Sequence, residues 1–185
     1  MQRPPPSRID LPDCMLRAWT PRDAHRLRMV LQASDAHLRL FTPWVVDGRV
    51  PGETIEDRLA QHAEHFAAGV EWVYGIFSPD ESAILGGCGM YTRVGPDAIE
   101  LGYWLASDQT GRGLAKRASA VLTRLAFASP EIDRVEIRCD RLNVASMRIP
   151  ERLGFHVTAN PVVAARPDLV VWELRRDQVD SSIDQ

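Results

Sequence analysis

The sequence contains little of what marks secreted or membrane proteins. Its three cysteines, Cys14, Cys88 and Cys139, form no CxxC pair and cannot all pair with one another, so they predict reduced thiols. The first residues, MQRPPPSRIDLPD, hold no apolar signal core, and no stretch approaches the length of a membrane span. These absences predict a cytoplasmic protein without a membrane partner.

The chain also lacks a strong excess of either charge. A formal net charge of −3 argues against a general nucleic-acid binder, although a local basic patch stays open. With 185 residues, 45% of them hydrophobic, the chain can bury the core of one domain without metals or disulfides. It shows no repeat and no internal linker. We expect a flexible proline-rich lead over 1–13, a domain over 14–175 and a polar tail over 176–185.

Hydrophobic periodicity and turn residues predict a mixed α/β domain around one central sheet. Thr20 before Pro21 is typical of a helix start, and Gly69 of a helix end. The expected strands are 14–19, 70–78, 83–94, 98–107, 134–140, 155–163 and 169–176, and the middle three should form an antiparallel meander. The expected helices are 20–34, 52–69, 143–154 and one with Leu114, Ala118, Val121, Leu122 and Leu125 on its apolar face.

The stretch DQTGRGLAKRAS (108–119) carries unusual positive charge for a helix start, where acidic residues are favoured. A strand, a glycine turn and a helix point free backbone N–H groups at one spot, and Gly111 and Gly113 let a bulky anion approach. The stretch therefore predicts a phosphate site. The alternative is that Arg112, Lys116 and Arg117 are merely solvated surface residues. It contains no GxxxxGK[ST], and GRGLAK lacks the third glycine of a dinucleotide fingerprint.

Glu100 is the carboxylate that most needs an explanation. Strand alternation puts Glu100, Gly102 and Trp104 on one face of the 98–107 strand, opposite Ile99, Leu101, Tyr103 and Leu105. A central sheet covered on both sides should reject a carboxylate, and burial would raise the pKa of this one toward a value useful for proton transfer. We expect a general base near an acceptor amine. The alternatives are a carboxylate neutralised by an arginine, or one that only binds the amine.

Five motifs, in order along the chain, resemble one family of enzymes. They are LRAWTPRDAHRL (16–27), LFTPW (40–44), IELGYWL (99–105), TGRGLA (110–115) and NVASMRIPERLGF (143–155). All are similar to motifs of the GCN5-related N-acetyltransferase (GNAT) family, in its RimJ/RimL-like branch of ribosomal-protein alanine acetyltransferases, and the resemblance spans 14–175. It implies a single-domain fold with a mixed sheet of about seven strands and about four helices, splayed between strands four and five.

The resemblance also implies a chemistry: direct transfer from acetyl-CoA to a primary amine, without a metal. It implies that the pantetheine arm lies in the splay and that Ser146 protonates the departing thiolate. Glu100, expected from the strand pattern, is the second catalytic residue. Many members carry Gln or Arg where this chain has Thr110, which puts only that side-chain contact in doubt. The implied cofactor-binding residues are Trp104, Leu105, Thr110, Gly111, Arg112, Gly113, Leu114, Ala115 and Asn143, and the implied substrate-binding residues are Phe41, Trp44 and Tyr103.

Without the resemblance, Asn143 is a plain helix N-cap and Ser146 an unremarkable residue of the first turn. Pro150 adds a local argument, because it cannot donate to the carbonyl of Ser146 and should loosen that turn. His62 and His65 lie three apart with no third ligand, so they predict a solvated helix face and no metal.

Three further patterns are structural. The glycines of GGCG (86–89) indicate a bulge or close packing. The cysteines are expected to be buried residues rather than nucleophiles. Trp72, Trp104 and Trp172 are expected in the core or in a pocket wall.

Other functions stay open beside the N-acetyltransferase. A non-catalytic acyl-CoA-binding module on the same fold is one, since a fold does not guarantee activity. An acyltransferase for longer acyl groups is the other. The acceptor is a protein or peptide N-terminus, or a small amine such as an antibiotic, and the oligomeric state stays open, a homodimer included.

Overall fold

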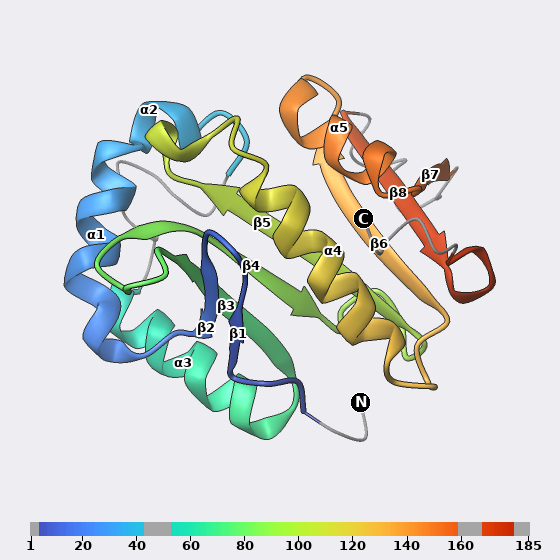
Figure 1. The fold of residues 1–185 in the computed structure, drawn as a ribbon, viewed down its shortest axis with the longest axis horizontal. Helices are drawn as coiled ribbons and strands as arrows, with labels where there is room; N and C mark the ends of the chain where they lie inside the picture. Colours follow the sequence, from blue (N-terminus) through green and yellow to red (C-terminus); the bar gives the residue numbers. More distant parts are fainter. Residues whose placement is uncertain (1–3, 43–52, 159–167, 180–185) are drawn as a thin grey trace.

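A computed structural model describes residues 4–42, 53–158 and 168–179, which fold around one twisted sheet of eight strands (Figure 1). The strands are β1 (Arg8–Asp10), β2 (Met15–Ala18), β3 (Glu71–Phe77), β4 (Ile84–Tyr91), β5 (Ala98–Leu105), β6 (Arg134–Asp140), β7 (His156–Thr158) and β8 (Leu169–Arg175). The helices are α1 (Ala24–Ala33), α2 (Asp35–Leu38), α3 (Ile55–Ala68), α4 (Leu114–Phe127) and α5 (Val144–Arg152). Short 3-10 turns, η1 (Pro21–Asp23), η2 (Ser107–Gln109) and η4 (Arg176–Gln178), complete them.

The sheet order is β1-β2-β3-β4-β5-β6-β8-β7, and only the β5–β6 junction is parallel. Those two strands pair only between 98–101 and 134–137, although β5 continues to Leu105 and β6 to Asp140. The later residues of β5 pair with β4 alone. The strands therefore diverge, which confirms the predicted splay, and the β3–β4–β5 meander is confirmed as well.

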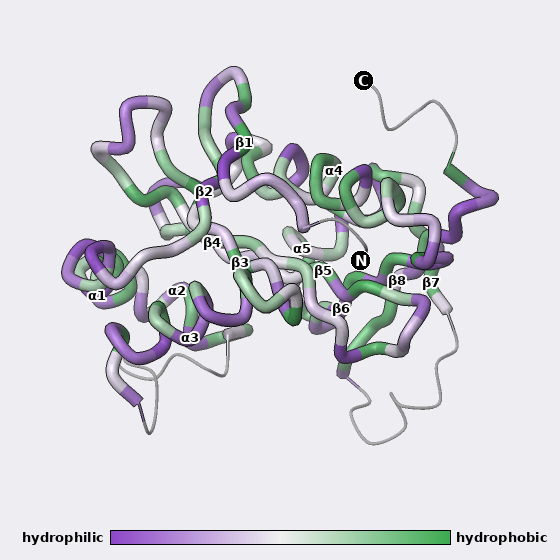
Figure 2. The backbone as a smooth tube through the Cα atoms, turned by 90° about the horizontal axis from the view of Figure 1, so that it is seen from below, coloured by the Kyte–Doolittle hydropathy of each residue, from purple (hydrophilic) through white to green (hydrophobic). Residues whose placement is uncertain are grey.

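Helices cover both faces of the sheet. Figures 1 and 2 show α4 and α5 on one face and α1, α2 and α3 on the other. The predicted apolar face of α4 is confirmed: Leu114, Ala118 and Leu122 are buried in the larger core cluster, and Val121 and Leu125 are partly buried. The smaller cluster, on the other face, is built around residues such as Leu31 and Leu59. The helices thus bury the two faces of one sheet separately.

The predicted helix ends follow the local chemistry of the sequence. Thr20 is the N-cap, and both its backbone N–H and its hydroxyl donate to Asp23 Oδ2, at 3.0 and 2.9 Å. Gly69 closes α3 in the left-handed conformation, with φ of +72°. A side chain there would be strained, so glycine sets this boundary.

The structure has one strand more than the approximately seven expected, because residues 8–10 of the lead form β1. Ile9 pairs with Leu16 of β2, so this edge strand depends on its partner, and three residues are too few to show a period. The first residues of the expected tail, Arg176–Gln178, form the 3-10 turn η4. The Arg176 guanidinium donates to the backbone carbonyls of Phe127, Ser129 and Ile132 and fixes η4. The one-turn helix α2 was not expected either.

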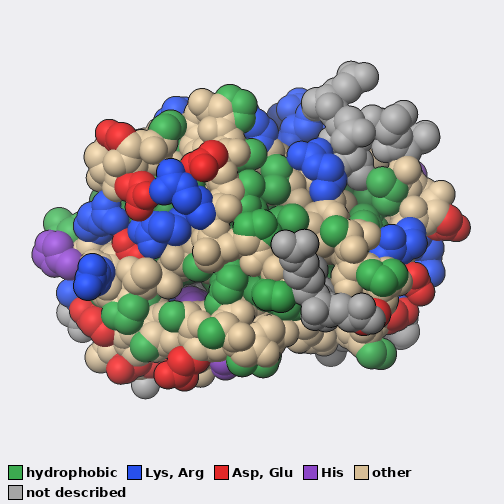
Figure 3. All heavy atoms as spheres, turned by 60° about the horizontal axis from the view of Figure 1, so that its bottom comes forward, with side chains coloured by type: hydrophobic (Ala, Val, Ile, Leu, Met, Phe, Trp, Pro, Cys, Tyr) green, Lys and Arg blue, Asp and Glu red, His purple; other side chains and the backbone are tan. Residues whose placement is uncertain are grey.

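Charge is distributed over the surface. On the face in Figure 3, basic side chains lie among acidic ones rather than in one continuous basic stripe. Within the described ranges, no helix combines the length and apolar character needed to cross a membrane.

Candidate active site

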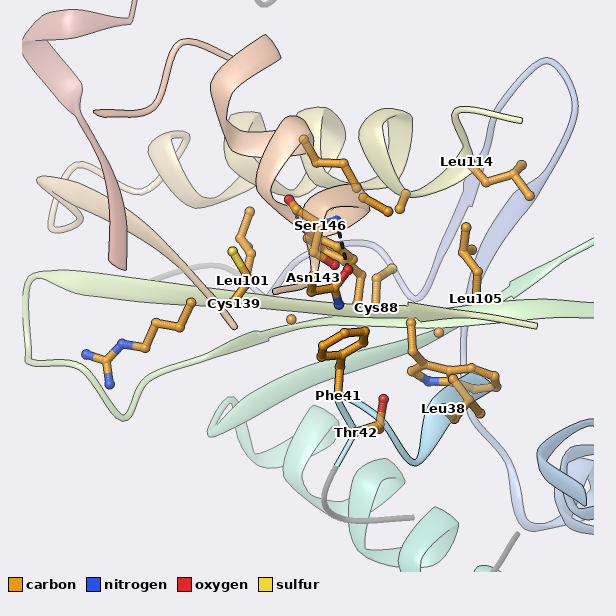
Figure 4. Close-up of a pocket in the computed structure, with 18 of the residues that line it drawn as sticks. Leu38, Phe41, Thr42, Cys88, Leu101, Leu105, Leu114, Cys139, Asn143 and Ser146 are labelled. Carbon is orange, nitrogen blue, oxygen red and sulfur yellow. Dashed lines mark hydrogen bonds between the residues drawn. The ribbon is translucent and has the colours of Figure 1, made fainter. Parts of the chain in front are cut away.

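A cavity of about 1090 Å³ opens where β5 and β6 diverge. It exceeds the roughly 300–1,000 Å³ of most small-molecule sites, which suits a site for two substrates. Figure 4 shows Asn143 and Ser146 on one side of the sheet and Phe41 and Thr42 on the other. The predicted residues that line it are Phe41, Glu100, Tyr103, Trp104, Leu105, Thr110, Gly111, Gly113, Leu114, Ala115, Asn143 and Ser146. Trp44 lies outside the described residues.

The 110–115 loop lines the cavity and leads into the N-terminus of α4. Gly111 and Gly113 both take left-handed backbone conformations, with φ of +76° and +74°, so glycine is favoured at both positions. Gly113 is the N-cap of α4, and its carbonyl accepts the N–H of Arg117. The N–H groups of the preceding helical residues have no intrahelical acceptor by geometry. Such a helix N-terminus can bind an anion, which is the chemistry that the sequence predicts for this loop.

The three cations near this loop differ in their surroundings. Lys116 lines the cavity, whereas Arg117 turns away to Asp13, with 2.5 Å between Nη2 and Oδ2. Arg112 is bound to the side chain of Gln109 and is not among the lining residues. The solvated-surface alternative thus fails for Arg117, which is paired, while Lys116 is placed to face an anion.

Ser146 is fixed at both of its peptide groups. Asn143 is the N-cap of α5, and its Oδ1 accepts the Ser146 N–H at 3.1 Å. The carbonyl of Ser146 accepts the hydroxyl of Tyr103 at 3.1 Å. The plain N-cap interpretation of Asn143 therefore holds, and the same hydrogen bond places Ser146 on the wall of the cavity.

Glu100 lies in a bidentate ion pair. It is buried on β5, and Arg93 donates to it through Nε at 2.9 Å and Nη2 at 2.5 Å. Arg138 Nε lies 3.8 Å from Oε2. The Arg93 guanidinium also lies over the ring of Tyr91, 4.5 Å from its centroid. The pKa of Arg93 is raised, and the hydrogen bond with Glu100 is the largest cause. Of the alternatives that the sequence leaves open, the structure shows the carboxylate paired with an arginine.

A family model described as "Acetyltransferase (GNAT) domain" matches residues 13–156, most of the chain. The chain belongs to the GNAT acetyltransferase family. Within this family, the solved structures most like it include RimJ/RimL-like proteins, as the motifs predict.

Sequence relatives of this GNAT protein align over part of their length. "Probable N-acetyltransferase YjcK" of Bacillus subtilis (strain 168) is 26% identical over 101 residues, which are 54% of this chain and 56% of YjcK. YdaF of the same organism is 36% identical over 72 residues, 37% of this chain and 39% of YdaF. The chain thus spans about half or less of these relatives.

Solved structures share the whole fold at low identity. RimL, the ribosomal L7/L12 alpha-N-protein acetyltransferase in complex with coenzyme A, has a TM-score of 0.77 and 20% identity, covering 92% of this chain and 99% of RimL. The microcin C7 self-immunity acetyltransferase MccE, in complex with acetyl-CoA and AMP, has a TM-score of 0.75 and 18% identity. The match covers 93% of this chain and 98% of MccE. At these identities the likeness shows the GNAT fold.

Two aromatic residues lie against glycines on the face toward α3. A β-carbon at Gly87 would lie 2.5 Å from Trp104 Nε1, and one at Gly89 or Gly102 would lie 3.1 Å from the ring of Tyr91. The sheet register also shifts beside Gly86. The GGCG glycines therefore serve both expected purposes, a bulge and close packing.

Trp104 and Tyr103 occupy faces opposite to their expected roles in this GNAT site. Trp104 packs against the smaller core cluster on the α3 side, and Tyr103 packs against the larger one and reaches α5. The loop that we expect to hold the cofactor leads into α4, on the face of Tyr103. The placement therefore fits Tyr103 on the cofactor side and Trp104 on the acceptor side, because alternate strand residues face opposite ways.

Sequence reasoning missed Glu136. This residue of β6 lies opposite Glu100 in register, has 1% side-chain exposure, and accepts from Arg138 at 2.8 Å and Arg134 at 3.2 Å. Charges of alternating sign thus run from Arg93 through Glu100, Arg138 and Glu136 to Arg134. The signal was present in RVEIRCD, where charged residues recur at every second position of a central strand.

The histidine and cysteine predictions have different outcomes. His62 lines the cavity. Burial, and then the nearby charges of Arg58 and His65, lower the pKa of His62 to about 4. The interpretation of a solvated helix face is therefore wrong for His62. Burial raises the pKa of Cys139 to about 11, which keeps this thiol protonated. In the described ranges, no group of three His, Cys, Asp or Glu residues could hold a metal.

The remaining structural predictions are confirmed. All three cysteines are buried free thiols, and burial raises the pKa of Cys88 as well. Trp72 and Trp172 are buried in the core, and Trp104 is part of the cavity wall.

Proposed function

We propose that the protein is an acetyl-CoA-dependent N-acetyltransferase that transfers the acetyl group directly to a primary amine. One observation carries the proposal: a single cavity joins the 110–115 loop on one face of the sheet to Glu100 and Arg93 on the other. A long donor with an anionic end suits the first part, and a cationic amine suits the second. The gap between β5 and β6 connects them.

The donor occupies the face of α4 and α5. The backbone of Thr110, Gly111, Arg112, Gly113, Leu114 and Ala115 binds the pyrophosphate, and Leu105 lines the path of the arm. Asn143 uses its Oδ1 for the Ser146 N–H, which leaves its amide NH₂ to donate to a carbonyl of the arm. Coenzyme A in the RimL structure and acetyl-CoA in the MccE structure support this assignment.

The transfer needs one bond to form and one to break. The amine nitrogen attacks the thioester carbonyl carbon, the C–S bond breaks, and its electron pair goes to sulfur. Ser146 donates its hydroxyl proton to this thiolate and regains one from water. Holding both substrates in line supplies most of the remaining rate enhancement.

Glu100 orients the amine. Arg93 donates two hydrogen bonds to the carboxylate and Arg138 lies 3.8 Å from it, so the carboxylate is held in a fixed place from which it can accept a hydrogen bond from the amine. Each carboxylate oxygen has a second acceptor position for that contact. The amine proton leaves to water in the open cavity, so we place Glu100 in substrate orientation rather than in general-base catalysis.

The acceptor enters on the face of α3. Phe41, which is 38% exposed, and Trp104 line that part of the cavity. The LFTPW motif supports Trp44 as a further acceptor-binding residue. The names of RimL and of the ribosomal-protein-S5-alanine acetyltransferase from Vibrio fischeri support a protein N-terminus, and that of MccE supports a small molecule.

A thiol-release assay with acetyl-CoA and a panel of N-terminal peptides, aminoglycosides and simple amines tests the function. We expect release with one acceptor class and, for Ser146→Ala, a loss in kcat on the order of a hundredfold with unchanged acetyl-CoA affinity. Acetyl-CoA binding without turnover on any acceptor would identify a binding module instead. Faster turnover of a longer acyl-CoA than of acetyl-CoA would identify the protein as an acyltransferase for longer acyl groups.

A further inference from the structure

Pro150 removes a helical hydrogen bond from the residue that we propose as proton donor. In a regular α-helix, the N–H of residue 150 donates to the carbonyl of residue 146. Helix α5 continues past Pro150 to Arg152, yet proline has no N–H to give. The carbonyl of Ser146 therefore needs another donor, because an unpaired backbone carbonyl away from water is costly.

Tyr103 supplies that donor from a different element. Its hydroxyl, at the end of a side chain from β5, donates to the Ser146 carbonyl at 3.1 Å. The ring packs against the larger core cluster, which fixes the direction of the hydroxyl. Burial raises the pKa of Tyr103, so the hydroxyl keeps its proton and remains a donor at neutral and acidic pH.

The result is a residue held from two sides by side chains. Asn143 binds the amide N–H of Ser146, and Tyr103 binds its carbonyl. The next residue is docked too, since Met147 Sδ lies 3.4 Å from Cys139 Sγ of β6. The first turn of α5 is thereby tied to both strands that diverge around the cavity, β5 and β6.

We propose that Tyr103 is a positioning residue whose hydroxyl replaces the missing amide of Pro150 and thereby fixes Ser146 beside the thioester sulfur. The inference rests on the proposed function, in which Ser146 protonates the thiolate. The hydroxyl proton of Tyr103 is committed to the carbonyl, so Tyr103 itself transfers no proton. It acts on the reaction through the position of Ser146 alone.

A double-mutant cycle between Tyr103 and Pro150 tests the replacement. Tyr103→Phe should lower kcat about three- to tenfold, the scale of one neutral hydrogen bond, with an unchanged KM for acetyl-CoA. Pro150→Ala restores an N–H at position 150 and should keep kcat within about twofold of wild type. The double variant should recover to the level of Pro150→Ala.

Matched variants separate this rescue from a general strengthening of α5. Glu151→Ala is an exposed change in the same helix that supplies no donor to Ser146, so Tyr103→Phe should stay impaired beside it. Equal impairment of Tyr103→Phe with and without Pro150→Ala would overturn the proposal. So would wild-type kcat in Tyr103→Phe.

The Ser146→Ala background shows whether Tyr103 acts through the serine hydroxyl. Alanine keeps the carbonyl and loses the proton donor, so Tyr103→Phe should have no further effect on kcat there. An undiminished loss on this background would overturn the proposal. Thermal unfolding of the wild type and the three variants of the Tyr103–Pro150 cycle reports the hydrogen bond itself, and this readout remains valid even if Ser146→Ala shows that the serine has no role in turnover.

Discussion

The two walls of the cavity are held in different ways. The α4–α5 wall, formed by Tyr103, Asn143, Ser146 and the 110–115 loop, uses neutral hydrogen bonds and backbone N–H groups. The α3 wall is formed by Phe41, Tyr91, Arg93, Glu100 and Trp104. It contains the Arg93–Glu100 ion pair, whose guanidinium lies over the ring of Tyr91, and the rings of Tyr91 and Trp104 pack against glycines. The first wall therefore offers mainly backbone and neutral polar groups, and the second offers side-chain charge.

This contrast fits the substrates that the proposed function assigns to each wall. A pyrophosphate and an amide-rich arm can be met by backbone donors, which cost no side-chain ordering. An amine needs a carboxylate, and a buried carboxylate must be stabilised when the amine is absent. Arg93 and Arg138 perform that task for Glu100. The α3 wall is therefore expected to respond to charge substitutions and pH, and the α4–α5 wall to backbone and hydroxyl substitutions.

The largest expected effect is on the α4–α5 wall. Gly113→Val places a branched side chain at φ of +74°, where the loop must keep its shape, so acetyl-CoA affinity should fall on the order of a hundredfold. Isothermal calorimetry measures it. Gly69→Val, at φ of +72° in the C-cap of α3, carries similar strain away from the loop and should keep the affinity. Wild-type affinity in Gly113→Val would mean that the donor binds elsewhere.

Glu100→Gln is the matching change on the α3 wall. The acceptor KM should rise about tenfold, because a charged hydrogen bond to the amine becomes neutral, and the KM for acetyl-CoA should stay constant. The pH–rate profile should keep its acidic limb, and disappearance of that limb would instead make Glu100 the general base. Glu173→Gln removes a half-buried carboxylate of β8 that does not line the cavity, and it should leave both constants unchanged.

The contrast also explains what could be predicted from the sequence. The α4–α5 wall is encoded in short local patterns: the glycines of TGRGLA and the Asn-x-x-Ser start of α5 are recognisable because each sets its own local backbone. The α3 wall depends on register between β4, β5 and β6. That Arg93 reaches Glu100, or that Glu136 lies opposite it, follows from strand pairing that no local pattern contains. Alternation correctly places Tyr103 and Trp104 on opposite faces, but it does not say which helices cover each face, so the side of the cavity that each residue serves could not be read from the strand pattern.

Asp23 extends the charge dependence of the α3 side to stability. Burial alone would raise its pKa, but hydrogen bonds from Arg17, Thr20 and Arg26 outweigh burial and lower the pKa from 3.8 to about 2. A carboxylate whose pKa is lower in the folded state than in the unfolded state stabilises the fold at every pH above its unfolded-state pKa. This stabilisation is lost as pH falls from about 4 to about 2. The contribution at neutral pH is about 2 kcal/mol. Asp23→Asn should remove it, as measured by thermal unfolding at pH 7.

The pH range sharpens the comparison between the walls. The stability difference between wild type and Asp23→Asn should shrink as pH falls through that window. The difference between wild type and Tyr103→Phe should stay constant over it, because the Tyr103 hydroxyl keeps its proton throughout. A pH-independent cost of Asp23→Asn would show that the carboxylate contributes packing and not charge.

The smallest expected effect concerns the apolar edge of the α3 wall. Phe41 lines the cavity at the end of α2 and is 38% exposed, so an acceptor covers only part of its ring. Phe41→Ala should raise the acceptor KM about threefold through lost apolar contact, and leave the KM for acetyl-CoA unchanged. Trp44→Ala is expected to act in the same direction. Met29→Ala removes an exposed apolar side chain of α1 that does not line the cavity, and serves as the control. If Phe41→Ala raises both KM values equally, or only lowers the melting temperature, Phe41 is a packing residue and the acceptor lies along the charged strands instead.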